Sequence, residues 1–103
     1  MEFKNVTVVK KANIYFGGTV TSRTINFPDG TRKTLGIMMG GEYEFNTAGK
    51  ELMEILAGEA EVLLQGEESW RVFREGDVFE VKADSSFRIR TAEILDYCCS
   101  YLP

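Results

Sequence analysis

The residue best suited to chemistry in this 103-residue chain is Glu51, because the sequence around it predicts a carboxylate facing the protein interior. Glu51, Met53 and Ile55 alternate along an expected strand, so their side chains share one face. A carboxylate on an interior face costs several kcal/mol unless it is hydrogen-bonded or reaches solvent or a ligand. The chain contains no histidine, and the thiols of Cys98 and Cys99 therefore lack the partner that would activate them. Glu51 is the best single candidate for a functional group.

Two glycine-containing spacings give Glu51 a structural setting. Six residues separate Glu51 from Gly58, and Gly76-Asp77 opens a second segment of the same kind. These spacings resemble the two sequence motifs of cupin barrels, which in metal-binding members carry three histidines. In this chain those three positions hold Phe45, Thr47 and Phe87. Transition metals prefer imidazole or thiolate ligands, so one carboxylate beside a hydroxyl will not hold one. We expect a cupin pocket with no metal and no other cofactor.

The elements that would position this pocket are short strands. β-Branched and aromatic segments recur about every ten residues, with glycine or aspartate at the breaks, which is typical of a barrel or sandwich. The predicted fold is all-β, a single-domain cupin or double-stranded β-helix, with residues 13–103 as the barrel and 1–12 as an N-terminal arm or edge strand. Gly49–Leu52 is the one segment that could form a helical turn. The expected strands are Val6–Val9, Ile14–Phe16, Thr19–Phe27, Thr34–Met39, Glu42–Asn46, Met53–Leu56, Ala60–Leu64, Trp70–Phe73, Val78–Val81, Ser86–Arg90 and Asp96–Leu102.

Alternation along these strands predicts which side chains face the lumen. If Phe45 points inward, so does Tyr43, and across the Gly40-Gly41 break Met39 and Ile37 follow. Phe87 and Ile89 would point inward together. On the last strand either Tyr97, Cys99 and Tyr101 or Cys98, Ser100 and Leu102 face inward. Three arginines fall on the outward side of this pattern: Arg32, Arg88 and Arg90.

Composition and charge exclude several classes of protein. With 44% hydrophobic residues the chain can form one core. The net charge of −4 lacks the basic stripe of a nucleic-acid binder, although one or two local arginines can still hold a phosphate. No apolar run reaches 18 residues and no signal peptide is evident, so we expect no membrane association and a cytoplasmic location.

An ordered series of short blocks gives a closer resemblance, covering roughly residues 13 to 102. The chain resembles the small bacterial pyrimidine/purine nucleoside phosphorylases, which are compact cupins. The resemblance implies phosphate-dependent cleavage of a broad range of purine and pyrimidine nucleosides to free base and ribose 1-phosphate, a pentosyl transfer with phosphate as co-substrate. The blocks are Tyr15–Gly18, Thr34–Met38, Gly41–Phe45, Glu51–Met53, Gly58, Trp70, Gly76–Phe79, Ser86-Phe87 and Tyr97–Leu102.

That chemistry needs cationic or N–H donors for phosphate and tolerance of positive charge on the ribose, but no protein nucleophile. Arg32 is the preferred phosphate ligand, followed by Arg88 and Arg90, and a Gly40-Gly41 nest could add N–H donors. Glu51 would be catalytic, stabilising the ribose cation and, with Thr47, binding ribose hydroxyls. Phe45, Phe87 and either Tyr43 or Tyr97 would stack on the base. Met53, which would also line the lumen, is the remaining predicted substrate-binding residue.

Two other functions stay open at this point. A metal-free cupin pocket can also serve a non-catalytic small-molecule sensor, which would bind ligand without turnover. An epimerase-like or lyase cupin is the third possibility, but the absence of histidine disfavours it. Because an open barrel leaves strand edges uncovered, and the Val6–Val9 arm could add a strand to a partner, we also expect a homodimer.

Overall fold

The computed structural model describes residues 2–103 and is built almost entirely from antiparallel strands. One 3₁₀ turn, η1 (Phe16–Gly18), follows β2. The strands are β1 (Thr7–Val8), β2 (Asn13–Tyr15), β3 (Val20–Asn26), β4 (Arg32–Met38), β5 (Gly41–Asn46), β6 (Glu51–Ala57), β7 (Glu59–Leu64), β8 (Arg71–Arg74), β9 (Val78–Val81), β10 (Ser86–Thr91) and β11 (Leu95–Tyr101).

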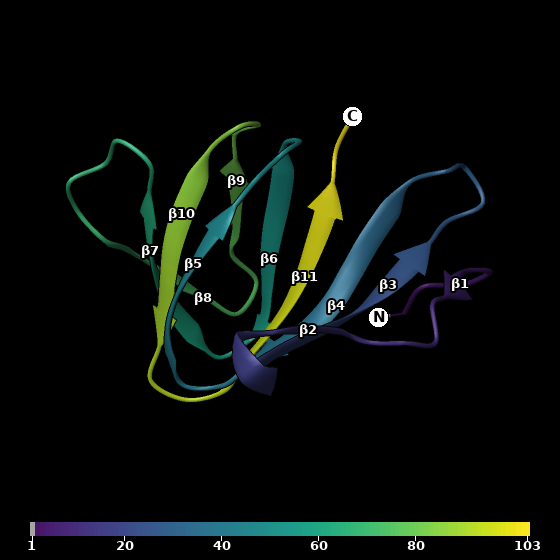
Figure 1. Cartoon of the computed structure of the whole chain (residues 1–103), viewed down its shortest axis with the longest axis horizontal. Coiled ribbons are helices and arrows are strands. Elements are labelled where there is room, and N and C mark those ends of the chain that lie inside the picture. Colours follow the sequence, from purple (N-terminus) through teal and green to yellow (C-terminus); the bar gives the residue numbers. More distant parts are fainter. Residues whose placement is uncertain (1) are drawn as a thin grey trace.

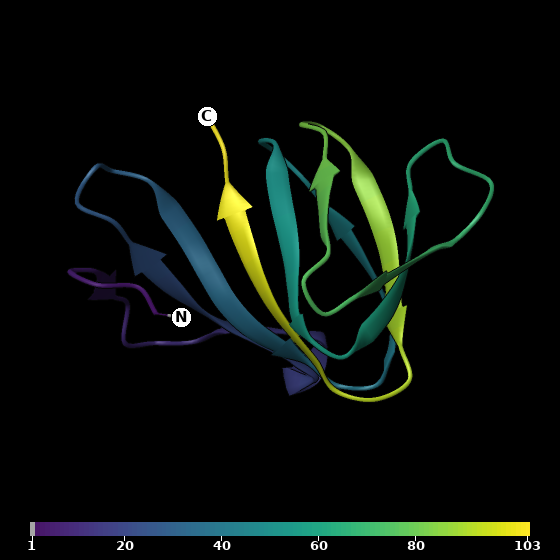
Figure 2. The same ribbon diagram turned by 180° about the vertical axis from the view of Figure 1, so that it is seen from behind.

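Two sheets face one another across the core. The seven-stranded sheet has the order β1-β3-β4-β11-β6-β9, with β2 also paired to β3, and the four-stranded sheet has the order β5-β10-β7-β8. Figure 1 shows the sheets close together at the lower end and spread apart at the upper end, beside the C-terminus. The reverse view shows β11 and β6 side by side in the middle of the larger sheet (Figure 2). This is the jelly-roll barrel that the strand spacing predicts.

The core lies between the sheets and takes apolar side chains from both. Met38, Ile55 and Leu95 come from the larger sheet, while Val62 and Ile89 come from the smaller one, and each is at most 1% exposed. Burying a side chain of this size contributes about 1.5–3 kcal/mol. The inward positions predicted for Tyr43, Phe87, Ile89, Met53 and Ile55 are confirmed by their burial.

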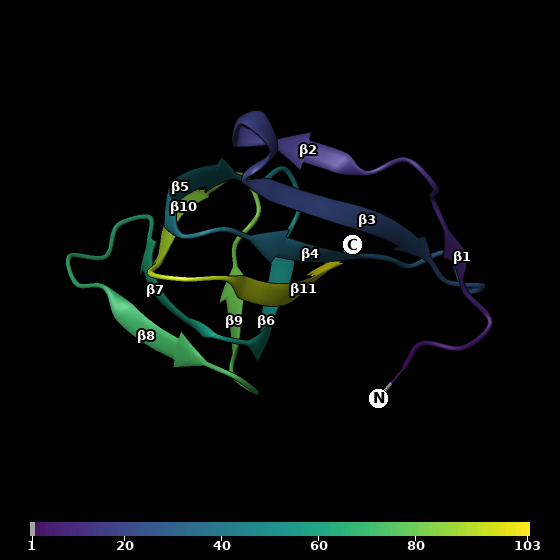
Figure 3. The ribbon, with the colours of Figure 1, turned by 90° about the horizontal axis from the view of Figure 1, so that it is seen from below.

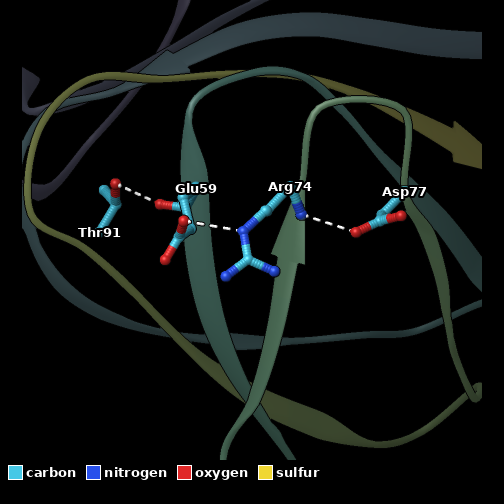
Figure 4. A network of polar contacts seen from close by, with 4 residues as sticks. All are labelled: Glu59, Arg74, Asp77 and Thr91. Atoms are coloured by element: carbon cyan, nitrogen blue, oxygen red, sulfur yellow. Dashed lines mark hydrogen bonds and ion pairs between the residues drawn. The ribbon is translucent and has the colours of Figure 1, made fainter.

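The two cupin-motif glycines have structural functions. Gly58 has φ +95° and Gly76 has φ +91°, a region that favours glycine. Beside Gly76, the Asp77 carboxylate accepts a hydrogen bond of 2.7 Å from the Arg74 backbone N–H, which fixes the turn between β8 and β9. Figure 4 shows this turn joined through the Arg74 side chain to Glu59 (3.1 Å), whose carbonyl accepts a hydrogen bond from Thr91.

Gly49–Leu52, the segment considered for a helical turn, does not form one, because β6 already begins at Glu51. The only helical turn among residues 2–103 is η1, which carries three consecutive positive φ values: Phe16 (+51°), Gly17 (+67°) and Gly18 (+102°). Two glycines make this conformation accessible. None of the helical segments in the described part of the chain is long and apolar enough to cross a membrane.

The N-terminal arm contributes an edge strand to its own barrel. In β1, Thr7 and Val8 pair with Asn26 and Ile25 of β3. Viewed from below, β1 and β2 follow one another along the same edge of the larger sheet (Figure 3). β1 thus forms one edge of the larger sheet.

The inward positions predicted for Ile37 and Met39 are wrong. Met38 is 1% exposed, whereas Ile37 and Met39 are 36% and 44% exposed. The alternation of side chains holds only along one strand, and β4 and β5 belong to different sheets. The corner at Gly40-Gly41 therefore resets the pattern. Because Met38 rather than Ile37 faces inward, Arg32 also faces inward, on the same side of β4 as Thr34, Gly36 and Met38.

Candidate active site

A cavity of about 280 Å³ lies between the two sheets, toward the end where β5 stops and β6 starts. Arg32, Glu51 and Tyr101 stand at the ends of β4, β6 and β11, which Figure 1 shows at the spread end of the barrel. The cavity is lined by Tyr15, Ser22, Arg32, Met38, Phe45, Asn46, Glu51, Met53, Phe87, Tyr97, Cys99 and Tyr101.

The larger sheet forms a polar wall, arranged in rows across β4, β11 and β6. In the outermost row, Tyr101 lies opposite Arg32 on one side and Glu51 on the other. The next row holds Thr34, Cys99 and Met53, and the third holds Gly36, Tyr97 and Ile55. These pairings settle the register of the last strand in favour of Tyr97, Cys99 and Tyr101 facing the cavity.

Glu51 is the only carboxylate that lines this cavity within residues 2–103. The Cys99 thiol donates to its Oε1 atom over 3.4 Å. Burial raises the pKa of Glu51, while the Cys99 hydrogen bond and the Arg32 charge act in the opposite direction. The pKa of Cys99 is also raised, by burial and then by the negative charge of Glu51, which keeps it a neutral thiol. Cys99 is therefore a hydrogen-bond donor rather than a nucleophile.

Arg32 lines the cavity, so the outward orientation predicted for it is wrong for the reason given above. Its guanidinium lies 4.2 Å from the centre of the Tyr101 ring. Within residues 2–103 it forms no ion pair, unlike Arg71, Arg74, Arg88 and Arg90. A guanidinium without a carboxylate partner retains its donors for an anion.

Tyr97 crosses the floor of the cavity in a fixed position. A Cβ atom on Gly36 would lie 2.6 Å from the Tyr97 ring, so only glycine at this position leaves room for the ring. Tyr97 interacts with the Ser22 hydroxyl, which accepts a hydrogen bond of 3.2 Å from the Asn13 side chain. Burial raises the pKa of Tyr97, so it acts as a neutral hydroxyl.

Aromatic side chains form the opposite wall. Phe45 and Phe87, on neighbouring strands of the smaller sheet, stack with ring centres 5.6 Å apart. Tyr15, which precedes η1, meets Phe45 edge-on at 6.3 Å. Phe16 also packs against Phe45, at 5.4 Å, and so links η1 to the smaller sheet. The cavity thus offers a flat apolar surface facing a polar one.

Four of the predicted substrate-binding residues lie outside the cavity. Tyr43 is buried beneath it and donates to the Met39 carbonyl over 2.7 Å. Thr47 follows β5, and its hydroxyl donates to the Lys82 carbonyl over 2.6 Å, a contact that ties β5 to the β9–β10 loop. Arg88 and Arg90 project from the outer face, as alternation predicts, and pair with Glu44 and Glu61.

Two other candidate sites are less suited to binding an anion than the cavity between the sheets. Gly40-Gly41 is not part of the cavity, and Gly40 packs closely against the Ala92 carbonyl. A second groove, about 380 Å³ in volume, runs along Gly58–Glu61 and Arg90–Ile94. The arginine of this groove, Arg90, already forms an ion pair with Glu61 at 3.0 Å, and its guanidinium lies 3.9 Å from the centre of the Trp70 ring. We therefore place the site in the cavity between the sheets, although the groove is larger.

The residues at the metal positions of cupins do not fit a transition metal. Phe45 and Phe87 present stacked rings, and the Thr47 hydroxyl is bound to backbone groups. No group of three or more histidine, cysteine, aspartate or glutamate side chains suited to a metal occurs within residues 2–103. Glu51 and Cys99 alone are too few donors.

The two facing antiparallel sheets have the cupin fold. A cupin superfamily protein from Desulfitobacterium hafniense shares the architecture, with a TM-score of 0.68 at 20% identity, over 89% of this chain and 82% of that one. A protein of unknown function from Acinetobacter sp. ADP1 is far more similar, with a TM-score of 0.96 at 43% identity, over 98% of both chains.

The sequence comparisons narrow the class to one family. The model of the pyrimidine/purine nucleoside phosphorylase family matches residues 10–101. A protein of that name from Syntrophotalea carbinolica is 62% identical over 101 residues, which are 98% of this chain and 97% of that one. Another, from Geotalea daltonii, is equally similar over the same shares of both chains. The chain belongs to the pyrimidine/purine nucleoside phosphorylase family, which confirms the resemblance seen in the sequence blocks.

Proposed function

We propose that this protein cleaves purine and pyrimidine nucleosides with phosphate, releasing the free base and ribose 1-phosphate. The observation that carries the proposal is the two-walled cavity, in which one unpaired arginine and one carboxylate face stacked aromatic rings. Its volume of about 280 Å³ is near the lower limit for a small-molecule site. Family membership supports nucleoside and phosphate as the substrates.

The aromatic wall accounts for broad base specificity. Phe45 and Phe87 present a flat surface that any nucleobase can stack against, since every base has a π face. Tyr15 borders the same space. Stacking does not distinguish the hydrogen-bonding edges of purines and pyrimidines, so a site that relies on it accepts both.

The polar wall accounts for the reaction. Arg32 holds phosphate with its oxygen directed at the anomeric carbon C1′. The bond between C1′ and the base nitrogen breaks as the C1′–O bond forms, and the ribose passes through an oxocarbenium-like state. Glu51 stabilises that positive charge and binds ribose hydroxyls. With hydrogen phosphate as nucleophile, its proton ends on the departing base, so atoms and charge balance without a metal or a protein nucleophile.

A product assay tests this function. Uridine and inosine are each incubated with the protein, with and without phosphate, and the products are separated by chromatography. We expect uracil and hypoxanthine together with ribose 1-phosphate, and only when phosphate is present. Equal base release without phosphate would instead identify a hydrolase. Ligand-induced thermal stabilisation without turnover would identify a non-catalytic sensor.

A further inference from the structure

The outermost row of the polar wall places an aromatic ring between two opposite charges. Tyr101 lies directly opposite Arg32 on β4 and directly opposite Glu51 on β6. Adjacent strands are about 4.8 Å apart, so the backbones of Arg32 and Glu51 are roughly 10 Å apart. Both side chains are long enough to meet above a small residue on β11, and their opposite charges attract one another.

Despite that attraction, the two charges do not form an ion pair. The Arg32 guanidinium instead lies over the Tyr101 ring, 4.2 Å from its centre. The Glu51 carboxylate takes its hydrogen bond from the Cys99 thiol, 3.4 Å away. Tyr101 is itself held in place, since its hydroxyl lies 3.4 Å from the Thr34 hydroxyl. Tyr101 thus stands in the row between the two charged residues, with the guanidinium over its ring.

We propose that Tyr101 is a positioning residue that keeps Arg32 and Glu51 apart, so that each charge remains available to a substrate. The inference rests on the proposed function, in which Arg32 binds phosphate and Glu51 faces the ribose. If Arg32 and Glu51 formed an ion pair, phosphate would have to displace the Glu51 carboxylate from the Arg32 guanidinium before it could bind there. The ion pair would also remove the negative charge that the ribose cation needs.

Phosphate binding in four variants tests this role: Tyr101→Phe, Tyr101→Leu, Glu51→Gln and the double variant Tyr101→Leu/Glu51→Gln. Inorganic phosphate is titrated into each by calorimetry, and the phosphate KM is measured at saturating inosine. Tyr101→Phe keeps the ring, so its phosphate Kd should stay within about twofold of wild type. Tyr101→Leu frees Glu51 to capture Arg32 and should weaken binding by about tenfold, an equilibrium change of roughly 1.4 kcal/mol.

The double variant shows whether Tyr101→Leu weakens phosphate binding because Glu51 captures Arg32 or because the substitution disrupts the site in general. Removing the carboxylate leaves Arg32 with no partner to capture it, so Tyr101→Leu/Glu51→Gln should bind phosphate within about threefold of Glu51→Gln. Wild-type phosphate affinity in Tyr101→Leu would overturn the proposal, as would a double variant that binds as weakly as Tyr101→Leu. If the leucine variant does not fold, Tyr101→Met replaces it in the same comparison.

Arg32→Ala distinguishes failure of this inference from failure of the proposed function. Loss of phosphate binding in Arg32→Ala with normal binding in Tyr101→Leu would overturn only the spacing role. Unchanged phosphate binding in Arg32→Ala would show that the phosphate site itself is wrong. Arg74→Ala, which removes an arginine from an ion pair outside the cavity, should bind phosphate like wild type.

Discussion

Glu51 combines two properties that usually conflict, because it is partly buried and yet has few polar partners. It accepts a hydrogen bond from a thiol, which is a weak donor, and the positive charge that lowers its pKa is that of Arg32. A structural carboxylate would be expected to bind several N–H groups or an arginine directly. The poor satisfaction of Glu51 within the free protein is what a group awaiting a substrate would show.

Glu51→Gln should lower turnover of inosine by roughly 10²–10³ while keeping the shape of the side chain. The amide cannot stabilise the ribose cation as a carboxylate does, although it can still accept the Cys99 hydrogen bond. Steady-state kinetics with confirmation of folding by circular dichroism is the measurement. Glu54→Gln, an exposed position on the same strand, is the matched control and should keep full activity. Full activity in a folded Glu51→Gln variant would make Glu51 structural.

The same substitution should raise stability near neutral pH. Because burial raises the pKa of Glu51, its ionised form is less favourable in the folded protein than in the unfolded chain. The stabilising contribution of protonated Glu51 to the folded protein is fully present below its ordinary pKa of 4.5. It is lost as the pH rises through the raised pKa that Glu51 has in the folded protein. Glu51→Gln should therefore melt at a higher temperature than wild type at pH 7, with the gain disappearing near pH 3.5. A gain that persists or grows in acid would contradict this assignment.

At the scale of elements, β11 supplies one side chain to each row of the polar wall. Tyr97 reaches its position only because β4 carries a glycine beneath the ring, so the floor of the cavity depends on the pairing of two particular residues. A methyl group there would lie 2.6 Å from both the ring and the Thr21 carbonyl. Neither the Tyr97 ring nor the Thr21 backbone can move aside without disturbing the packing of Gly36, Tyr97 and Ile55 across the three strands.

Gly36→Ala should destabilise the fold by about 1–3 kcal/mol, a typical cost of overpacking, and should reduce activity by displacing Tyr97. Thermal unfolding should show a fall in Tm of more than about 4 °C. Gly49→Ala is the matched control, since its Cβ would lie 3.5 Å from the nearest heavy atom, an ordinary contact, and should change stability by less than about 0.5 kcal/mol. Equal stability of the two variants would show that Tyr97 is free to move.

The sequence predicts the elements better than it predicts the site. Strand spacing and turn residues are local signals, and they identify the barrel and the inward positions of Phe87, Ile89 and Met53. The face of Arg32 was missed because it depends on the corner at Gly40-Gly41, which separates two sheets and leaves no periodic signal. The placement of Thr47 was missed because its partners, Lys82 and Ser85, are distant in the chain.

The sequence alone does not identify several other cavity residues, although some of them carry a signal. Tyr15 precedes a Phe-Gly-Gly turn of unusual backbone geometry, and Tyr101 and Cys99 face inward in one of the two registers that alternation allows for the last strand. Ser22, Asn46 and Met38 have no distinctive local pattern. They become neighbours only when β3, β4, β5 and β11 assemble.

At the scale of the whole molecule, the outer surface retains apolar side chains. Ile14 and Ile37 flank Thr21 in one row across β2, β3 and β4, and they are 66% and 36% exposed. Val78 on the edge strand β9 is 46% exposed. Exposed apolar residues and open strand edges favour association.

We expect a homodimer in solution, with a mass near twice the 11.6 kDa of the chain. Multi-angle light scattering over micromolar concentrations, before and after fourfold dilution, is the measurement. An 11.6 kDa species throughout that range would contradict the expectation.

We also expect the purified protein to carry no stoichiometric metal, because phenyl rings occupy two of the three positions where cupins place histidine ligands. Elemental analysis should give far less than one manganese, iron, nickel or zinc per chain, and a chelator should leave phosphorolysis unchanged. Close to one metal ion per chain, with activity lost on chelation, would be the contrary result.

The separation of the cavity into two walls on different sheets has a consequence for protein engineering. Phe45 and Phe87 lie on the smaller sheet, whereas Arg32 and Glu51 lie on the larger one. A library built on Phe45 and Phe87 can therefore reshape the proposed base preference while the backbone that carries the two charged groups stays intact. New specificities for modified bases should therefore be reachable in few mutational steps. The polar residues of the larger sheet cannot be varied in the same way, because side chains in neighbouring rows contact one another and a change at one position affects the next.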